Sequence, residues 1–66
     1  MNISINGKTQ SVSANLRLPE LLQQLGLADK PVVIELNLNA LTPSELQTTV
    51  LNEGDQLELV ILAPGG

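Results

Sequence analysis

The sequence contains no cysteine, histidine, phenylalanine, tyrosine or tryptophan. Without cysteine, neither a disulfide nor a thiolate-bound metal can hold the chain together. Without aromatic side chains, the hydrophobic core must be built from aliphatic residues. The usual pairings of nucleophile and general base need His, Cys or Tyr, and the carboxylates are scattered along the chain, so we expect a protein that is not an enzyme.

Positive charge is also scarce. Lys8, Arg17 and Lys30 stand against seven acidic residues, which gives a formal net charge of −4. Nucleic-acid binding needs clustered Lys or Arg, so no nucleic-acid partner is expected. The acidic balance fits either a partner with a basic surface or a domain whose charge only keeps it from aggregating.

Long hydrophobic runs and clusters of metal ligands are missing as well. No apolar run reaches the roughly 18 residues that a membrane span needs, and no basic segment followed by an apolar run suggests an export signal, so we expect a cytoplasmic protein without a membrane partner. Glu53 and Asp55 flank a glycine in a turn. Two such ligands are too few for a metal, and solvated turn residues explain them better.

A chain of 66 residues has room for one domain. We place this domain at residues 1–62 and treat residues 63–66 as a flexible, reactive C-terminal tail. The expected order of elements is strand, strand, helix, strand, short strand, short helix, strand.

The first quarter of the chain predicts a β-hairpin. Ile3 and Ile5 alternate with polar residues and lead into Asn6-Gly7, the dipeptide favoured in type I′ turns because both central residues need a positive φ. The polar strand that follows, Lys8 to Val12, is typical of a sheet edge.

A helix is predicted next, because Leu18, Leu21, Leu22 and Leu25 recur at positions i, i+3, i+4 and i+7. This apolar stripe should lie across the inner face of the sheet. Gly26 fits the C-terminal stop of the helix. Its N-terminus lacks a Ser or Thr cap, which weakens it by about 1 kcal/mol.

The middle of the chain predicts a third strand at Val32 to Asn37, with Val32, Ile34 and Leu36 facing the helix. A turn over Asn37–Ala40 should follow, and Leu41 should begin a short fourth strand. The segment Thr42-Pro43-Ser44-Glu45 is a capping box that predicts the start of a short helix.

The last strand runs into an unusual C-terminus. Its alternation places Leu57, Leu59 and Ile61 on the helix face and Glu58, Val60 and Leu62 on the other. Pro64 has no N–H for a sheet ladder, so the chain should leave the sheet there. Gly65 and Gly66 carry no side chain, which lets a narrow partner channel close around bare backbone and leaves the carboxylate as the only functional group. A frayed end without function is the alternative.

The resemblance to known families rests on the last strand, on the Asn52-Glu53-Gly54-Asp55 turn before it and on the diglycine end. In these features the chain resembles ubiquitin and, over all 66 residues, the ThiS family of sulfur carriers. This implies an α+β fold of the ubiquitin-like β-grasp type, a mixed sheet of four to five strands packed on one main helix. MoaD-like carriers for molybdopterin synthesis share the fold and the terminal chemistry and are one alternative. A β-grasp binding module with an inert terminus is another.

The resemblance also implies the chemistry. An E1-like adenylyltransferase of the ThiF type would use ATP and Mg²⁺ to adenylate the Gly66 carboxylate. Sulfur from a donor such as a cysteine desulfurase would convert it to a thiocarboxylate, which a thiazole synthase of the ThiG type would use to build the thiazole ring of thiamine. Gly65 and Gly66 match the family motif, whereas Pro64 is outside its invariant part. The carrier itself would bind no cofactor.

The alternation of the last strand further predicts a docking surface. Val60 and Leu62 should stand on the open face of the sheet beside Val33, with Glu35 and Glu58 at the rim. An apolar cluster at the root of a reactive tail suggests a docking site for the adenylyltransferase. Together with Pro64 and Gly65 these three residues are the predicted partner-binding residues. General surface hydrophobicity in a leucine-rich chain is the alternative.

Overall fold

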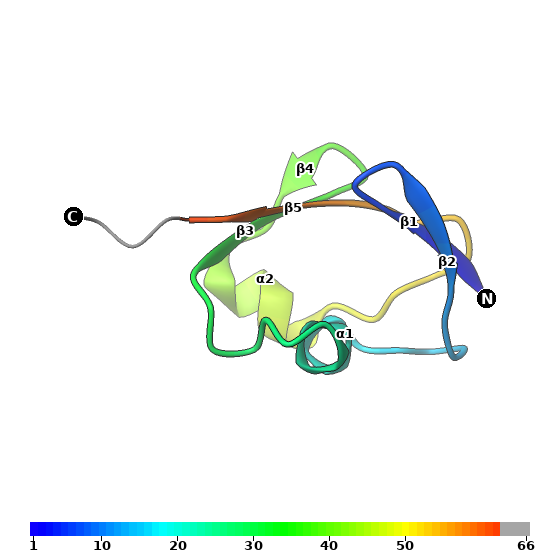
Figure 1. The fold of residues 1–66 in the computed structure, drawn as a ribbon, viewed down its shortest axis with the longest axis horizontal. Coiled ribbons are helices and arrows are strands. Elements are labelled where there is room, and N and C mark those ends of the chain that lie inside the picture. The colour runs from blue at the N-terminus through cyan, green and yellow to red at the C-terminus, as the bar shows by residue number, and fades with distance from the viewer. Residues whose placement is uncertain (63–66) are drawn as a thin grey trace.

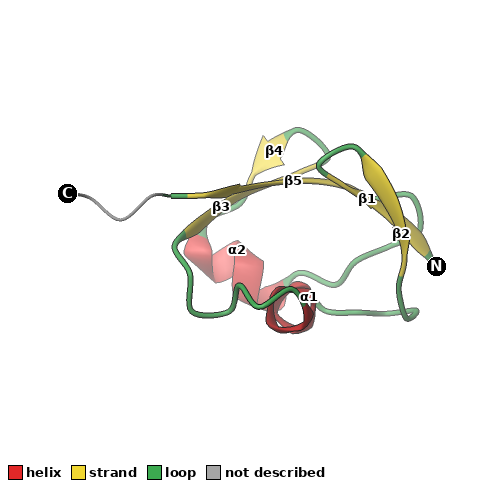
Figure 2. Ribbon diagram, in the orientation of Figure 1, coloured by secondary structure: helices red, strands yellow, loops and turns green. Residues whose placement is uncertain are grey.

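The computed structural model describes residues 1–62, which form one five-stranded sheet and two helices (Figure 1). The elements in chain order are β1 (Asn2–Ile5), β2 (Lys8–Ser11), α1 (Leu18–Gln24), β3 (Val32–Leu36), β4 (Asn39–Ala40), α2 (Pro43–Thr48) and β5 (Gln56–Ile61). Both helices lie on the same face of the sheet, and no helix covers the other face in the described part of the chain (Figure 2).

The strands are arranged in the order β2-β1-β5-β3-β4. The last strand, β5, therefore lies in the middle, parallel to β1 and antiparallel to β3. A parallel neighbour requires a crossover connection, and α1 supplies it. The polar strand β2 is at one edge with all four residues exposed, as predicted. The expected α+β class and mixed sheet are confirmed.

The core is the single layer of aliphatic side chains between the sheet and α1. Leu18 and Leu21 of the helix are almost completely buried, as are Ile3, Ile34 and Leu57 from three adjacent strands. Removing such side chains from water is the main favourable term for a domain of this size. The full set of buried hydrophobic residues is Ile3, Ile5, Leu16, Leu18, Leu21, Leu22, Ile34, Leu51, Leu57 and Leu59.

The fourth leucine of the predicted helical stripe does not join this core. Leu25 is the C-cap of α1 and is 37% exposed. The helix ends at Gln24, and Gly26 reverses the chain with φ of 74°, as its predicted role as a stop requires. The prediction for Leu25 is wrong because the residue lies in this terminal turn, away from the sheet. Leu16, which precedes the helix, is buried instead.

Both predicted helix starts show the expected chemistry. Thr42 and Glu45 form the reciprocal capping box of α2: the Glu45 N–H donates to Thr42 Oγ1 at 3.1 Å, and the Thr42 N–H donates to Glu45 Oε1 at 2.9 Å. At α1 the Arg17 N–H donates to Glu20 Oε1 at 3.0 Å, while the Arg17 side chain makes no cap. The absence of a Ser or Thr cap on α1 is thus only half compensated.

Two β-hairpin turns have positive φ at both central residues, one between β1 and β2 and the other between β3 and β4. Asn6 and Gly7 have φ of 50° and 83°, as a type I′ turn demands, so the predicted turn is confirmed. Asn37 and Leu38 have φ of 50° and 73° and connect β3 directly to β4. The fourth strand therefore begins at Asn39 and ends before Leu41, and the predicted start at Leu41 is wrong. Leucine is rare at positive φ, which hid this two-residue turn in the sequence.

Candidate functional site at the end of strand β5

The site predicted from the sequence lies where β5 leaves the sheet. On one side, β5 pairs with β3 along most of its length, from Leu57 opposite Leu36 to Ile61 opposite Val32. On the other side, it pairs with β1 only at Gln56 and Leu57, opposite Ser4 and Ile5. The second half of β5 consequently has a strand neighbour on one side only.

The Asn6 side chain extends the contact between β1 and β5 as far as Leu59. Asn6 Oδ1 accepts a hydrogen bond from the Leu59 N–H at 2.8 Å, and Asn6 Nδ2 donates to the Leu59 carbonyl at 3.3 Å. The Asn6 backbone N–H also donates to the Leu57 carbonyl at 2.9 Å. Sequence reasoning identified Asn6 as a turn residue but missed these bonds, because the Asn-Gly signal reports backbone conformation and not what the side chain reaches.

The inward-facing residues of β5 do not share one environment. Leu57 and Leu59 are buried as predicted, at 1% and 9% exposure, whereas Ile61 is 53% exposed. The sequence predicted the face on which Ile61 lies and not how deeply it is buried. Alternation assigns a face, but at the end of β5 the side chain on that face is only half covered.

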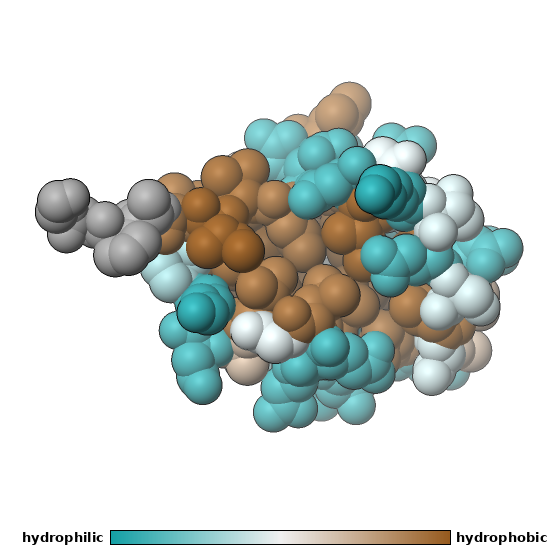
Figure 3. Space-filling view, viewed as in Figure 1, coloured by the Kyte–Doolittle hydropathy of each residue, from teal (hydrophilic) through white to brown (hydrophobic). Residues whose placement is uncertain are grey.

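The predicted docking residues are exposed and adjacent. Val60 lies directly opposite Val33, and both are about half exposed, at 56% and 43%. Leu62 follows two residues after Val60 on the same face, is 48% exposed, and donates its N–H to the Pro31 carbonyl at 2.8 Å. We call Val33, Val60 and Leu62 the apolar patch. Hydrophobic surface gathers at this end of the molecule (Figure 3).

A pair of like charges borders the apolar patch. Glu35 lies directly opposite Glu58 in the β3–β5 ladder, two residues along each strand from the Val33–Val60 pair. Both glutamate side chains are exposed. Like charges at directly opposed positions destabilise a sheet. Glu35 and Glu58 thus form the predicted acidic rim on the open face of the sheet.

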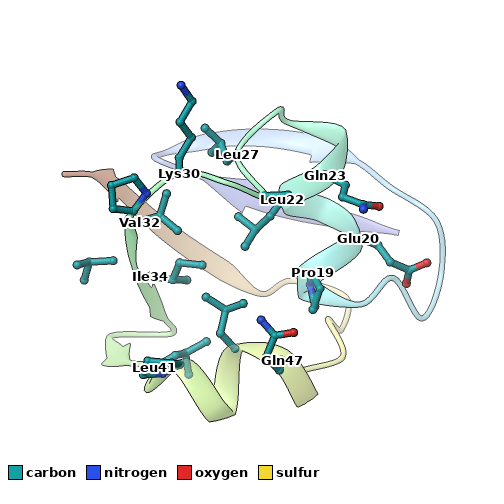
Figure 4. A pocket seen from close by; sticks show the side chains of 15 residues that line it. Pro19, Glu20, Leu22, Gln23, Leu27, Lys30, Val32, Ile34, Leu41 and Gln47 are labelled. Carbon is teal, nitrogen blue, oxygen red and sulfur yellow. The ribbon is translucent and has the colours of Figure 1, made fainter. Parts of the chain in front are cut away.

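A cleft opens on the helix side of the sheet. It has a volume of about 640 Å³ and opens between α1, α2 and β3 (Figure 4). Leu22, Val32 and Ile34 line it, and its charged residues are Glu20 and Lys30. The other side chains that line it are apolar or are the amides Gln23 and Gln47.

Two further features follow from residues 1–62. No group of three or more acidic residues is placed to hold a metal ion within this range. None of the helices in this range is long and apolar enough to cross a membrane. The predicted tail residues Pro64, Gly65 and Gly66 lie outside the described residues.

The mixed sheet with its central last strand, packed on one main helix, defines a ubiquitin-like β-grasp protein. The chain belongs to the ThiS family, whose profile matches residues 3–66. A thiamine biosynthesis protein (ThiS) from Geobacter metallireducens has the same fold in its crystal structure, with a TM-score of 0.82, 35% identity and full coverage of both chains. A solution structure of a thiamine biosynthesis protein from the same organism gives a TM-score of 0.78 at 33% identity over the whole chain and 88% of that protein.

Relatives known from sequence fall into two kinds. A protein called thiazole synthase from Paramagnetospirillum magneticum is 35% identical over the whole chain, but the chain spans only a fifth of its length. The ycf40 protein of Pyropia yezoensis, described as uncharacterized, is 33% identical over the whole chain and 93% of its own length. Domains of this family thus occur both as small proteins and within a longer one.

Proposed function

We propose that this protein is a sulfur carrier for thiamine thiazole synthesis, and that its reactive group is the Gly66 carboxylate. The observation that carries the proposal is the family match, which extends through the last two glycines. The names of the relatives support the pathway, since they include thiamine biosynthesis proteins and a thiazole synthase. The lack of His and Cys in the sequence supports a role as protein substrate and not as enzyme.

The proposed chemistry has two stages. A carboxylate is a poor electrophile, so an adenylyltransferase of the ThiF type first joins the Gly66 carboxylate to AMP and releases pyrophosphate from ATP bound with Mg²⁺. The outer sulfur of a persulfide on a donor such as a cysteine desulfurase then attacks the acyl carbon and AMP leaves. A second thiol cleaves the S–S bond of the resulting acyl disulfide and is itself oxidised to a disulfide. The product is a Gly66 thiocarboxylate, which a thiazole synthase of the ThiG type uses as its source of sulfur.

We assign the apolar patch to docking of the adenylyltransferase. Its three residues are exposed together on the open face of the sheet and adjoin the point where the described chain ends. A tail of four residues, Ala63 to Gly66, reaches at most roughly 13 Å when extended. A partner that holds the apolar patch must therefore keep its nucleotide pocket within that distance, with Pro64 and Gly65 in the channel between.

The proposal is tested by intact mass. After incubation with a ThiF-type adenylyltransferase, ATP, Mg²⁺ and a sulfur donor, the protein should gain the mass difference between one sulfur and one oxygen, and the C-terminal peptide should carry it. An unchanged mass would contradict the proposal.

Gly65→Val should keep the fold by circular dichroism and abolish activation, because a branched side chain does not fit a channel closed on bare backbone. Ala63→Val, which enlarges an existing side chain, is the matched control and should remain active.

A further inference from the structure

We propose that Asn6 is a positioning residue for activation of the tail, because its side chain holds the end of β5 and so sets the line along which the chain leaves the sheet. This inference rests on the proposed function. It concerns a residue remote in sequence from the tail, 53 positions from its partner Leu59.

The Asn6 side chain acts as a continuation of β1. The strand ends at Ile5, the last residue that β1 pairs with β5. The Asn6 carboxamide then offers an acceptor to the Leu59 N–H and a donor to the Leu59 carbonyl, at 2.8 and 3.3 Å, and so satisfies both backbone groups of a β5 residue that has no β1 residue paired with it. Asn6 therefore fixes two successive ladder positions of β5, Leu57 through its backbone and Leu59 through its side chain.

The other side of β5 is held further along. There the sheet pairing continues to Ile61, and the Leu62 N–H is bonded to the Pro31 carbonyl at 2.8 Å. Within residues 1–62, the bonds from Asn6 to Leu59 are the last that β5 makes on its β1 side. Without them, β5 could pivot on its β3 side from Leu57 onward. The direction in which β5 leaves the sheet would then no longer be fixed, whereas the Val33–Val60 pairing within the apolar patch would remain.

The backbone conformation of Asn6 in the turn and its side-chain hydrogen bonds to Leu59 can be tested separately. Asn6 has φ of 50°, which asparagine tolerates and glycine adopts freely. Glycine thus satisfies the turn but removes both bonds to Leu59. Aspartate keeps the left-handed conformation and the acceptor but loses the donor, so it should retain part of the effect.

The molecule contains a matched control at the opposite end of β5. Asn37 also has φ of 50° and opens the turn between β3 and β4. Its Oδ1 accepts from the Gln56 N–H at 2.9 Å, and its Nδ2 donates to Asp55 Oδ1 at 3.1 Å. Asn37→Gly therefore removes a similar pair of bonds from the start of β5, far from the tail.

The test compares wild type, Asn6→Gly, Asn6→Asp and Asn37→Gly. In hydrogen exchange, Asn6→Gly should speed exchange of the Leu59 amide by about fivefold or more, the size expected for loss of one net hydrogen bond. In ATP–pyrophosphate exchange with a ThiF-type adenylyltransferase, Asn6→Gly should lower kcat by about tenfold, because a displaced reacting group is slow to react. KM should change little, since the apolar patch is intact. Asn6→Asp should fall between Asn6→Gly and wild type, and Asn37→Gly should keep the wild-type kcat.

The outcomes separate this inference from the proposed function. No exchange with wild type would overturn both. Normal exchange with wild type and an unchanged kcat for Asn6→Gly would overturn only the role of Asn6. An equal loss in Asn6→Gly and Asn37→Gly would indicate general destabilisation and would also overturn it. If Asn6→Gly does not fold, Asn6→Asp decides, and a wild-type kcat for that variant together with faster Leu59 exchange counts against the proposal.

Discussion

The two halves of β5 share one alternation and have opposite environments. In the first half, Leu57 and Leu59 are buried under α1, and the backbone is held from both sides. At its end, Val60 and Ile61 are about half exposed, as is Leu62, which follows the strand, although alternation assigns Ile61 to the helix face. Burial in a small sheet is therefore decided by what covers a face and by where that cover ends. The first half of β5 stabilises the domain, and the second half is available for partners.

The largest expected effect is on stability and concerns the inward face of β5. Leu57→Ala should lower the free energy of unfolding by about 2–5 kcal/mol, because it leaves a cavity at a side chain that is only 1% exposed. Ile61→Ala, on the same face but 53% exposed, should cost much less, on the order of 1 kcal/mol or below. Urea unfolding monitored by circular dichroism measures both. Equal losses would show that the two halves do not differ as described.

An intermediate effect is expected on partner binding and concerns the outward face. Val60→Asp places a charge in the apolar patch and should weaken association with the adenylyltransferase at least about fivefold, as loss of an interface residue worth roughly 1 kcal/mol does. Gln56→Asp introduces the same side chain on the same face in the first half of β5 and should leave binding unchanged. Titration calorimetry on both folded variants measures their affinity for the adenylyltransferase. Unchanged binding by Val60→Asp would exclude this face as the docking surface.

The smallest expected effect concerns the acidic pair at the boundary between the halves. Glu58→Gln should raise stability by a few tenths of a kcal/mol, because it removes repulsion from Glu35 directly opposite. Salt screens exposed charges, so the gain should shrink as ionic strength rises. Unfolding midpoints at low and high salt measure it. A loss of stability in Glu58→Gln would mean that the pair does not repel in the folded protein.

The sequence predicted the elements well because each has a local cause. The Asn6-Gly7 turn, the spacing of the first three leucines of α1 and the capping box at Thr42 depend on residues close together in the chain, and all three are confirmed. The exposure of Val33, Val60 and Leu62 also followed from alternation alone.

The errors have a different origin, because they depend on packing between distant segments. The exposure of Ile61 and Leu25 reflects where the helix cover ends, which no local pattern reports. The hydrogen bonds from Asn6 to Leu59 join the first central residue of a turn to a strand at the other end of the chain. The turn after β3 was predicted, but as four residues and not two, because only one of the two residues at its centre, Asn37 and Leu38, favours a positive φ.

The central position of β5 has a consequence for the order of folding. The strand is the last of the five in the chain, yet it must insert between β1 and β3 before the sheet is complete. Contacts of such high sequence separation form slowly, since a long loop must close first. The apolar patch, which needs Val33 and Val60 side by side, arises only after that step. A partner that requires both the patch and the tail, as proposed above, would select chains that have finished folding over unfolded ones, even though these carry the same terminal glycines.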